Sequence, residues 1–230
     1  MERASSGGRP AYTLSGFGVA AGVTAAAQAA QQAGLPNVGL WRRIASTLQV
    51  LAALLGGLMA FYTGGLLAAT SNPLWSAAPR LLAARFAAAS MAAAASALAL
   101  LERRGQRAKT AGRLEDLAAL AATLELVIGT ASDRIYRAKG VSSALDEVPL
   151  GPTYHVVAEM AGTMPPIGLH VGNALLRRRS GALGSTASLA ILMGSSALRL
   201  TMLYAGNESA KRPLDYFAVT PPLSINGATH

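Results

Sequence analysis

The sequence predicts an all-α protein, a polytopic integral membrane helix bundle of about six transmembrane helices, and three observations lead to this prediction. Only 13% of the 230 residues are charged, whereas a soluble domain carries about 25%. Hydrophobic residues make up 52% of the chain, and its mean hydropathy is +0.36. Basic residues gather at the ends of apolar runs, which is typical of membrane loops. Too few charges remain to cover a soluble helical surface, so the composition argues against a soluble enzyme.

The first predicted element, 12–33, is free of charge but rich in Ala, Gly, Ser and Thr. Alanine contributes little to membrane insertion, so this helix needs neighbours in order to span. The alternatives are a signal peptide and a helix lying on the membrane surface. A signal peptide is disfavoured because the segment has no compact Leu-rich core.

The remaining predicted spans are longer apolar runs bounded by charges or turn residues. They cover approximately 44–69, 81–101, 114–132, 154–176 and 182–205. Asn72-Pro73 marks a turn, because the residue before proline is pushed out of the helical region. Pro165-Pro166 is expected to interrupt the 154–176 helix. We expect one membrane domain over 1–230, with 207–230 as an extended tail.

The basic residues predict the orientation of the bundle. Arg42-Arg43, the cluster from Arg103 to Arg113, and Arg177–Arg179 fall on one side if six helices span. Short loops rich in Lys and Arg face the cytoplasm. We therefore place both termini and the 134–153 loop outside. The net charge is +9, but its basic residues cluster at the ends of apolar runs, as in membrane loops. With aromatics at only 5%, no nucleic-acid partner is expected.

Four ionisable residues within or beside the spans are candidates for function. Glu125 falls near the middle of a span, where it serves as a proton relay or as the wall of a ligand site, or is a protonated structural carboxyl. Arg199 either extends to the interface or binds a ligand or carboxylate. His155 and Glu159 are four residues apart and share a helix face. They form either a proton path or a structural pair.

Haem and metal are not expected in this chain. Cysteine is absent, which excludes thiolate ligands. The two internal histidines, His155 and His170, are separated by about 22 Å of helix rise, so they cannot clamp one metal or haem.

A stripe of small residues, Gly56, Ala60, Gly64 and Ala68, recurs every four positions and predicts close helix packing. Tyr62 lies beside this stripe and carries a hydroxyl that needs a partner. It is either a member of an interfacial aromatic belt or a ligand-binding residue.

Three groups of motifs together carry a resemblance to a known family. The motifs are Tyr62-Thr63-Gly64-x-Leu66-Leu67 followed by Asn72-Pro73-x-Trp75, then Gly162-x-x-x-Pro166, then Gly194-x-x-x-Leu198-Arg199 with Ala205-Gly206. From about 44 to 206 the chain resembles the polysulfide-reductase membrane-subunit (NrfD-like) family. Members commonly have eight spans, so this chain resembles a shortened member, a fragment, or one that a companion chain completes.

The resemblance implies a quinone-reactive anchor subunit without haem in a bacterial respiratory oxidoreductase of the plasma (inner) membrane. It also implies a ferredoxin-type iron–sulfur subunit and a molybdopterin-type catalytic subunit as partners, and menaquinone or ubiquinone as the cofactor. We expect Tyr62 to bind the quinone carbonyl, with Glu159, His155, Glu125 and Arg199 as further candidates. The alternatives are a small transporter or permease, favoured by the double-proline break, and a purely structural anchor. Whether the subunit is itself an enzyme stays open.

Overall fold

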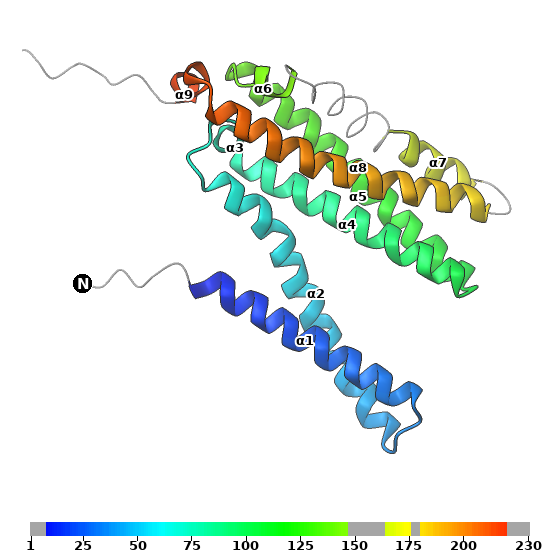
Figure 1. The fold of residues 1–230 in the computed structure, drawn as a ribbon. Helices are drawn as coiled ribbons and strands as arrows, with labels where there is room; N and C mark the ends of the chain where they lie inside the picture. The colour runs from blue at the N-terminus through cyan, green and yellow to red at the C-terminus, as the bar shows by residue number, and fades with distance from the viewer. Residues whose placement is uncertain (1–7, 147–163, 176–179, 220–230) are drawn as a thin grey trace, which may run out of the picture. The chain divides into compact units, whose positions relative to one another are not determined.

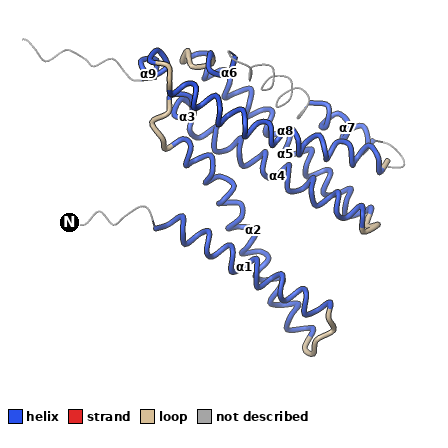
Figure 2. Tube along the Cα trace, in the orientation of Figure 1, coloured by secondary structure: helices blue, strands red, loops and turns tan. Residues whose placement is uncertain are grey.

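The structure, a computed structural model, describes residues 8–146, 164–175 and 180–219. These residues form helices and short turns without a strand (Figures 1 and 2). The predicted all-α class is therefore confirmed. The chain divides into two compact units, Met1–Thr63 and Gly64–His230. Each is described by itself below.

The first unit contains α1 (Gly8–Gln32) and most of α2 (Val38–Ala68). The turn between the helices uses Gly34 and Asn37 with φ of 69° and 66°, a conformation that glycine and asparagine adopt most readily. Phe17 of α1 lies against Gly56 of α2, where an added Cβ would come within 3.2 Å of the ring. The packing predicted for this part of the small-residue stripe is thereby confirmed.

The second unit is built on three long helices, α4 (Pro79–Arg104), α5 (Ala108–Ala138) and α8 (Gly181–Ala210). The shorter α7 (Met164–Leu175) packs on α5 and α8 (Figure 1). Small side chains fill the middle of this bundle and let the helices approach closely. The buried residues there are Ala92, Ala95, Ala118, Ala121, Ala122 and Ile191.

Larger side chains fill the end of the second unit where α8 finishes. Three short helices gather there, namely α3 (Pro73–Ala77), α6 (Ser143–Asp146) and α9 (Pro213–Val219) (Figure 1). The buried core includes Trp75, Phe86, Tyr136 and Met202.

Three described helices are long and apolar enough to cross a membrane: Val38–Ala68, Pro79–Arg104 and Gly181–Ala210. They contain the predicted spans 81–101 and 182–205 in full and the predicted span 44–69 as far as Ala68. The predicted spans 12–33 and 114–132 coincide with α1 and part of α5, which are helices of sufficient length. Only the last part of 154–176 lies within the described residues, so the number of six spans stays a prediction.

The prediction of an extended tail from 207 was wrong for the part that the structure describes. Helix α8 continues to Ala210, and α9 follows at once. Pro213 is the first residue of α9, the position where a helix tolerates proline best. The buried carboxylate of Asp215 accepts a hydrogen bond from the Ser209 hydroxyl at 2.7 Å, which fastens α9 to the end of α8.

Pro165-Pro166 lies in the described part of α7, which runs from Met164 to Leu175. The residues before Met164 lie outside the described residues, so the predicted interruption of the 154–176 helix at these prolines stays a prediction.

Candidate membrane-embedded polar site

The Asn72-Pro73-x-Trp75 motif fastens α3 to the end of α8. The Asn72 side-chain oxygen caps α3 by accepting from the Leu74 N–H at 3.1 Å. Its amide nitrogen donates to the Gly206 carbonyl at 2.6 Å, and the Trp75 indole N–H donates to the Met202 carbonyl at 3.0 Å. An added Cβ on Gly206 would collide with the indole ring. The motif and the Gly206 region of α8 thus pack together and hold α3 against the end of α8.

Gly64 has a comparable packing role at the start of the second unit. An added Cβ there would lie 2.5 Å from the Ala83 Cα of α4. The two backbones touch at this point, so only glycine fits. Gly64 therefore confirms the packing interpretation of the stripe.

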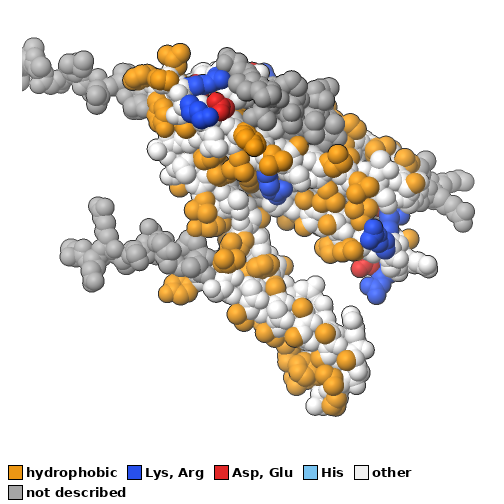
Figure 3. Space-filling model, in the orientation of Figure 1, with side chains coloured by type: hydrophobic (Ala, Val, Ile, Leu, Met, Phe, Trp, Pro, Cys, Tyr) orange, Lys and Arg blue, Asp and Glu red, His pale blue; other side chains and the backbone are white. Residues whose placement is uncertain are grey.

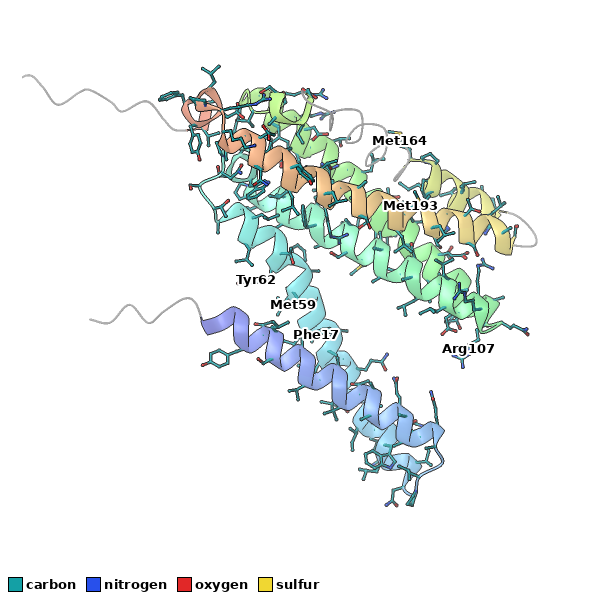
Figure 4. The ribbon with its side chains drawn as sticks, viewed as in Figure 1. Phe17, Met59, Tyr62, Arg107, Met164 and Met193 are labelled. Carbon is teal, nitrogen blue, oxygen red and sulfur yellow. The ribbon has the colours of Figure 1, made fainter. Side chains whose placement is uncertain are left out.

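Tyr62 lies in the first unit, near the end of α2, and is partly buried (Figure 4). No residue in the described part of the chain forms a hydrogen bond with its hydroxyl. Its predicted role toward a quinone stays a prediction.

Arg199 is held at the middle of the second unit. Its Nη1 donates to the Ser195 carbonyl at 3.1 Å and to the Ser195 Oγ at 2.6 Å. Its Nη2 donates to the Ser90 Oγ of α4 at 2.9 Å. Both hydroxyls donate hydrogen bonds to backbone carbonyls, Ser195 to that of Ala89 and Ser90 to that of Phe86. The two serine oxygens therefore present lone pairs to the guanidinium.

This geometry excludes the interpretation that Arg199 reaches out to the interface. Ser195 is the fifteenth of the thirty residues of α8, and Ser90 is the twelfth of the 26 residues of α4. The side chain runs back toward the helix centre rather than toward Ala210. A charge placed there costs about 2.5–3.5 kcal/mol on membrane-insertion scales, and such residues usually serve a function.

Glu125 is also buried in the second unit, with 6% of its surface exposed. Two contacts align α4 with α5: Arg85 lies against Gly129, and Arg103 binds Glu115. Glu125 therefore lies on α5 between these two contacts, and Arg199 lies on α8.

The other predicted site residues lie beyond what the structure describes. His155 and Glu159 fall in 147–163, outside the described residues. His170 is buried on α7. Among the described residues, no three His, Asp or Glu side chains gather closely enough to hold a metal ion.

Sequence analysis missed two ion pairs of the second unit. Asp133 lies just past the predicted 114–132 span, where it is mostly buried and 3.8 Å from the Arg85 Nη1. Arg103 was treated as a loop cation, yet its Nε and Nη2 bind one oxygen of buried Glu115 at 2.6 and 2.5 Å. An arginine inside or at the edge of an apolar span requires an acceptor, and that signal was present in the sequence.

These features define an all-α membrane helix bundle with ionisable groups at membrane depth. A family model described as "Polysulphide reductase, NrfD" matches residues 13–209. The chain therefore belongs to the NrfD (polysulphide reductase) family, and its role is that of a membrane subunit. Searches of curated proteins and of solved structures each found no match.

Proposed function

We propose that this chain is the quinone-reactive anchor of a bacterial respiratory oxidoreductase in the plasma membrane. It passes electrons between membrane quinone and a partner iron–sulfur subunit of ferredoxin type, which serves a molybdopterin-type catalytic subunit. Family membership supports the anchor role. The observation that carries the quinone proposal is the guanidinium of Arg199 at the centre of the bundle.

The chemistry of Arg199 fits a quinone carbonyl. A guanidinium has five N–H donors, and three hydrogen bonds are formed within the described residues. The remaining donors lie on a side chain that is only partly buried. A carbonyl oxygen reached from the bilayer is the acceptor that matches them, and a charge-assisted hydrogen bond is strong at this depth.

In this proposal the bound quinone supplies the redox chemistry, and the chain binds it, orients it and handles its protons. Arg199 donates a hydrogen bond to a quinone carbonyl oxygen, and Tyr62 of the first unit stays a separate candidate for such a hydrogen bond. Glu125, His155 and Glu159 hold or relay protons.

The experiment that tests the proposal measures binding of a quinone-site probe, the fluorescent inhibitor heptyl-hydroxyquinoline N-oxide, to the full chain in lipid nanodiscs. Charge-assisted hydrogen bonds contribute about 1.5–3 kcal/mol, so Arg199→Gln should raise the Kd by roughly tenfold or more. Tyr62→Phe removes a neutral hydrogen bond and should raise it about two- to tenfold. Arg134→Gln, at the exposed end of α5, is the matched control and should change nothing.

Probe binding that is the same in Arg199→Gln and in the wild type would remove Arg199 from the site. If the wild type also bound no probe, the chain would instead be a structural anchor.

A further inference from the structure

A cavity of about 290 Å³ lies along the first turns of α5, away from the proposed quinone site. Its described lining residues are Ala108, Lys109, Gly112, Arg113 and Asp116. Lys109 and Arg113 are four residues apart and so share one helix face. Gly112, which lies between them in the chain, is buried.

The cavity lies at the depth of lipid headgroups. The candidate span α4 ends at Arg104, and the candidate span α8 begins at Gly181. These two ends are neighbours, because an added Cβ on Gly181 would lie 3.1 Å from the Arg103 Nη1. In the space-filling view, basic side chains gather at this end of the unit beside a broad apolar surface (Figure 3).

The charges of Lys109 and Arg113 are available to a ligand. The Glu115 carboxylate is bound by Arg103, and Glu102 is paired with Arg107 at 3.5 Å. Neither Lys109 nor Arg113 has an ion pair within the described residues. Asp116 is the one carboxylate in the described lining and lies about 4.5 Å further along the helix axis than Arg113, so these side chains carry a net positive charge.

An apolar track continues from the two cations toward the middle of the bundle. Leu117, Leu120 and Leu124 are 41%, 59% and 50% exposed. Their spacing of three and four residues extends the face of Lys109 and Arg113 along α5. A cationic headgroup pocket followed by a leucine track matches a phosphate joined to an acyl chain.

We propose that this cavity binds an anionic phospholipid, with the phosphate between Lys109 and Arg113 and an acyl chain along the leucine track. Basic pockets at the ends of membrane helices are suited to anionic headgroups. The leucine track favours a lipid over free phosphate, because only a lipid gains by covering it. The site does not depend on the quinone proposal.

The test is native mass spectrometry of the full chain in detergent, titrated with dioleoyl phosphatidylglycerol or dioleoyl phosphatidylcholine. The wild type should retain phosphatidylglycerol in preference to phosphatidylcholine. Each basic side chain near an anionic headgroup contributes about fivefold in affinity. The double variant Lys109→Gln/Arg113→Gln should therefore lose about 25-fold in apparent affinity for phosphatidylglycerol, and Lys109→Arg/Arg113→Lys should keep it.

The matched control is Arg134→Gln/Arg137→Gln, which removes the same charge from exposed positions at the other end of α5. An equal loss in this control, or equal retention of both lipids by the wild type, would overturn the proposal. Inorganic phosphate at millimolar concentration should not displace the lipid; displacement would mean that the cavity recognises phosphate alone. If the double variant does not fold, Lys109→Gln in the exposed first turn should lower the affinity about fivefold.

Discussion

Glu115 shows how a single buried charge holds the helices of the second unit together. Its carboxylate is 3% exposed, accepts a hydrogen bond from the Arg103 Nε at 2.6 Å and lies 2.5 Å from the Arg103 Nη2; the Arg103 side chain is 15% exposed. The pair joins the end of α4 to the start of α5, and both side chains also lie against Gly184 of α8. Three helices therefore meet on one ion pair.

We predict that Glu115→Gln destabilises the protein by on the order of 3 kcal/mol, because it leaves the Arg103 charge buried without its counter-charge. The measurement is the thermal unfolding midpoint of the purified chain in detergent. The double variant Arg103→Met/Glu115→Met should recover much of the loss, since it removes both charges and keeps apolar bulk. A double variant as unstable as Glu115→Gln would show that packing, not charge, sets the effect.

The ion pair between Arg85 and Asp133 also joins two helices of the second unit, α4 and α5. Arg85 is 3% exposed, and Asp133 supplies its counter-charge from α5. Gly129 leaves the space in which the guanidinium lies. A buried arginine in this bundle thus requires both a carboxylate and a residue without a side chain on the neighbouring helix.

At the level of elements, the short helix α3 joins α8 to the rest of the second unit. Trp75 is 8% exposed, so its ring has little freedom to move. Its N–H donates a hydrogen bond to the Met202 carbonyl of α8, and its indole ring lies against Gly206. The motifs that carry the family resemblance therefore include residues whose role is to fix helix positions.

We predict that Gly206→Ala destabilises the protein by about 1–3 kcal/mol, because the new methyl group overlaps the Trp75 ring and overpacking costs that much. The control is Gly172→Ala in α7, where an added Cβ meets open space. That change should be neutral or stabilising by up to about 1 kcal/mol, the difference in helix propensity. Thermal unfolding of both variants checks the prediction, and equal midpoints would contradict it.

Across the whole molecule, the placement of charge predicts the orientation in the membrane. Arg107 in the turn between α4 and α5, and Arg103, Arg104 and Lys109 at the helix ends beside it, make this end basic. We place it in the cytoplasm. The chain has no cysteine, so introduced thiols can be labelled without background.

We predict that a cysteine at Gln106 resists a membrane-impermeant thiol reagent in intact cells and reacts after the cells are opened. Arg137→Cys, at the other end of α5, should react in intact cells. Both positions are exposed, so a difference in labelling reports the side of the membrane. The opposite pattern would reverse the orientation, and with it the side on which a partner subunit docks.

The sequence by itself determined the class of protein, the approximate limits of the long helices and the family. Insertion into a membrane depends on the summed hydrophobicity of each segment, which is local in the chain. The small-residue stripe likewise predicted close packing, because a helix face follows directly from spacing. The three groups of motifs between Tyr62 and Gly206 together indicated the NrfD family, which the family model confirms.

Only the tertiary structure decided which polar groups meet. Arg199 and Ser90 are 109 residues apart, and Asp133 joins Arg85 from a different helix. Such pairs depend on how helices rotate and slide against one another, which the hydrophobicity of each helix does not specify. The Arg199 side chain runs toward the centre of the bundle because it donates hydrogen bonds to the hydroxyl oxygens of Ser195 on its own helix and Ser90 on α4.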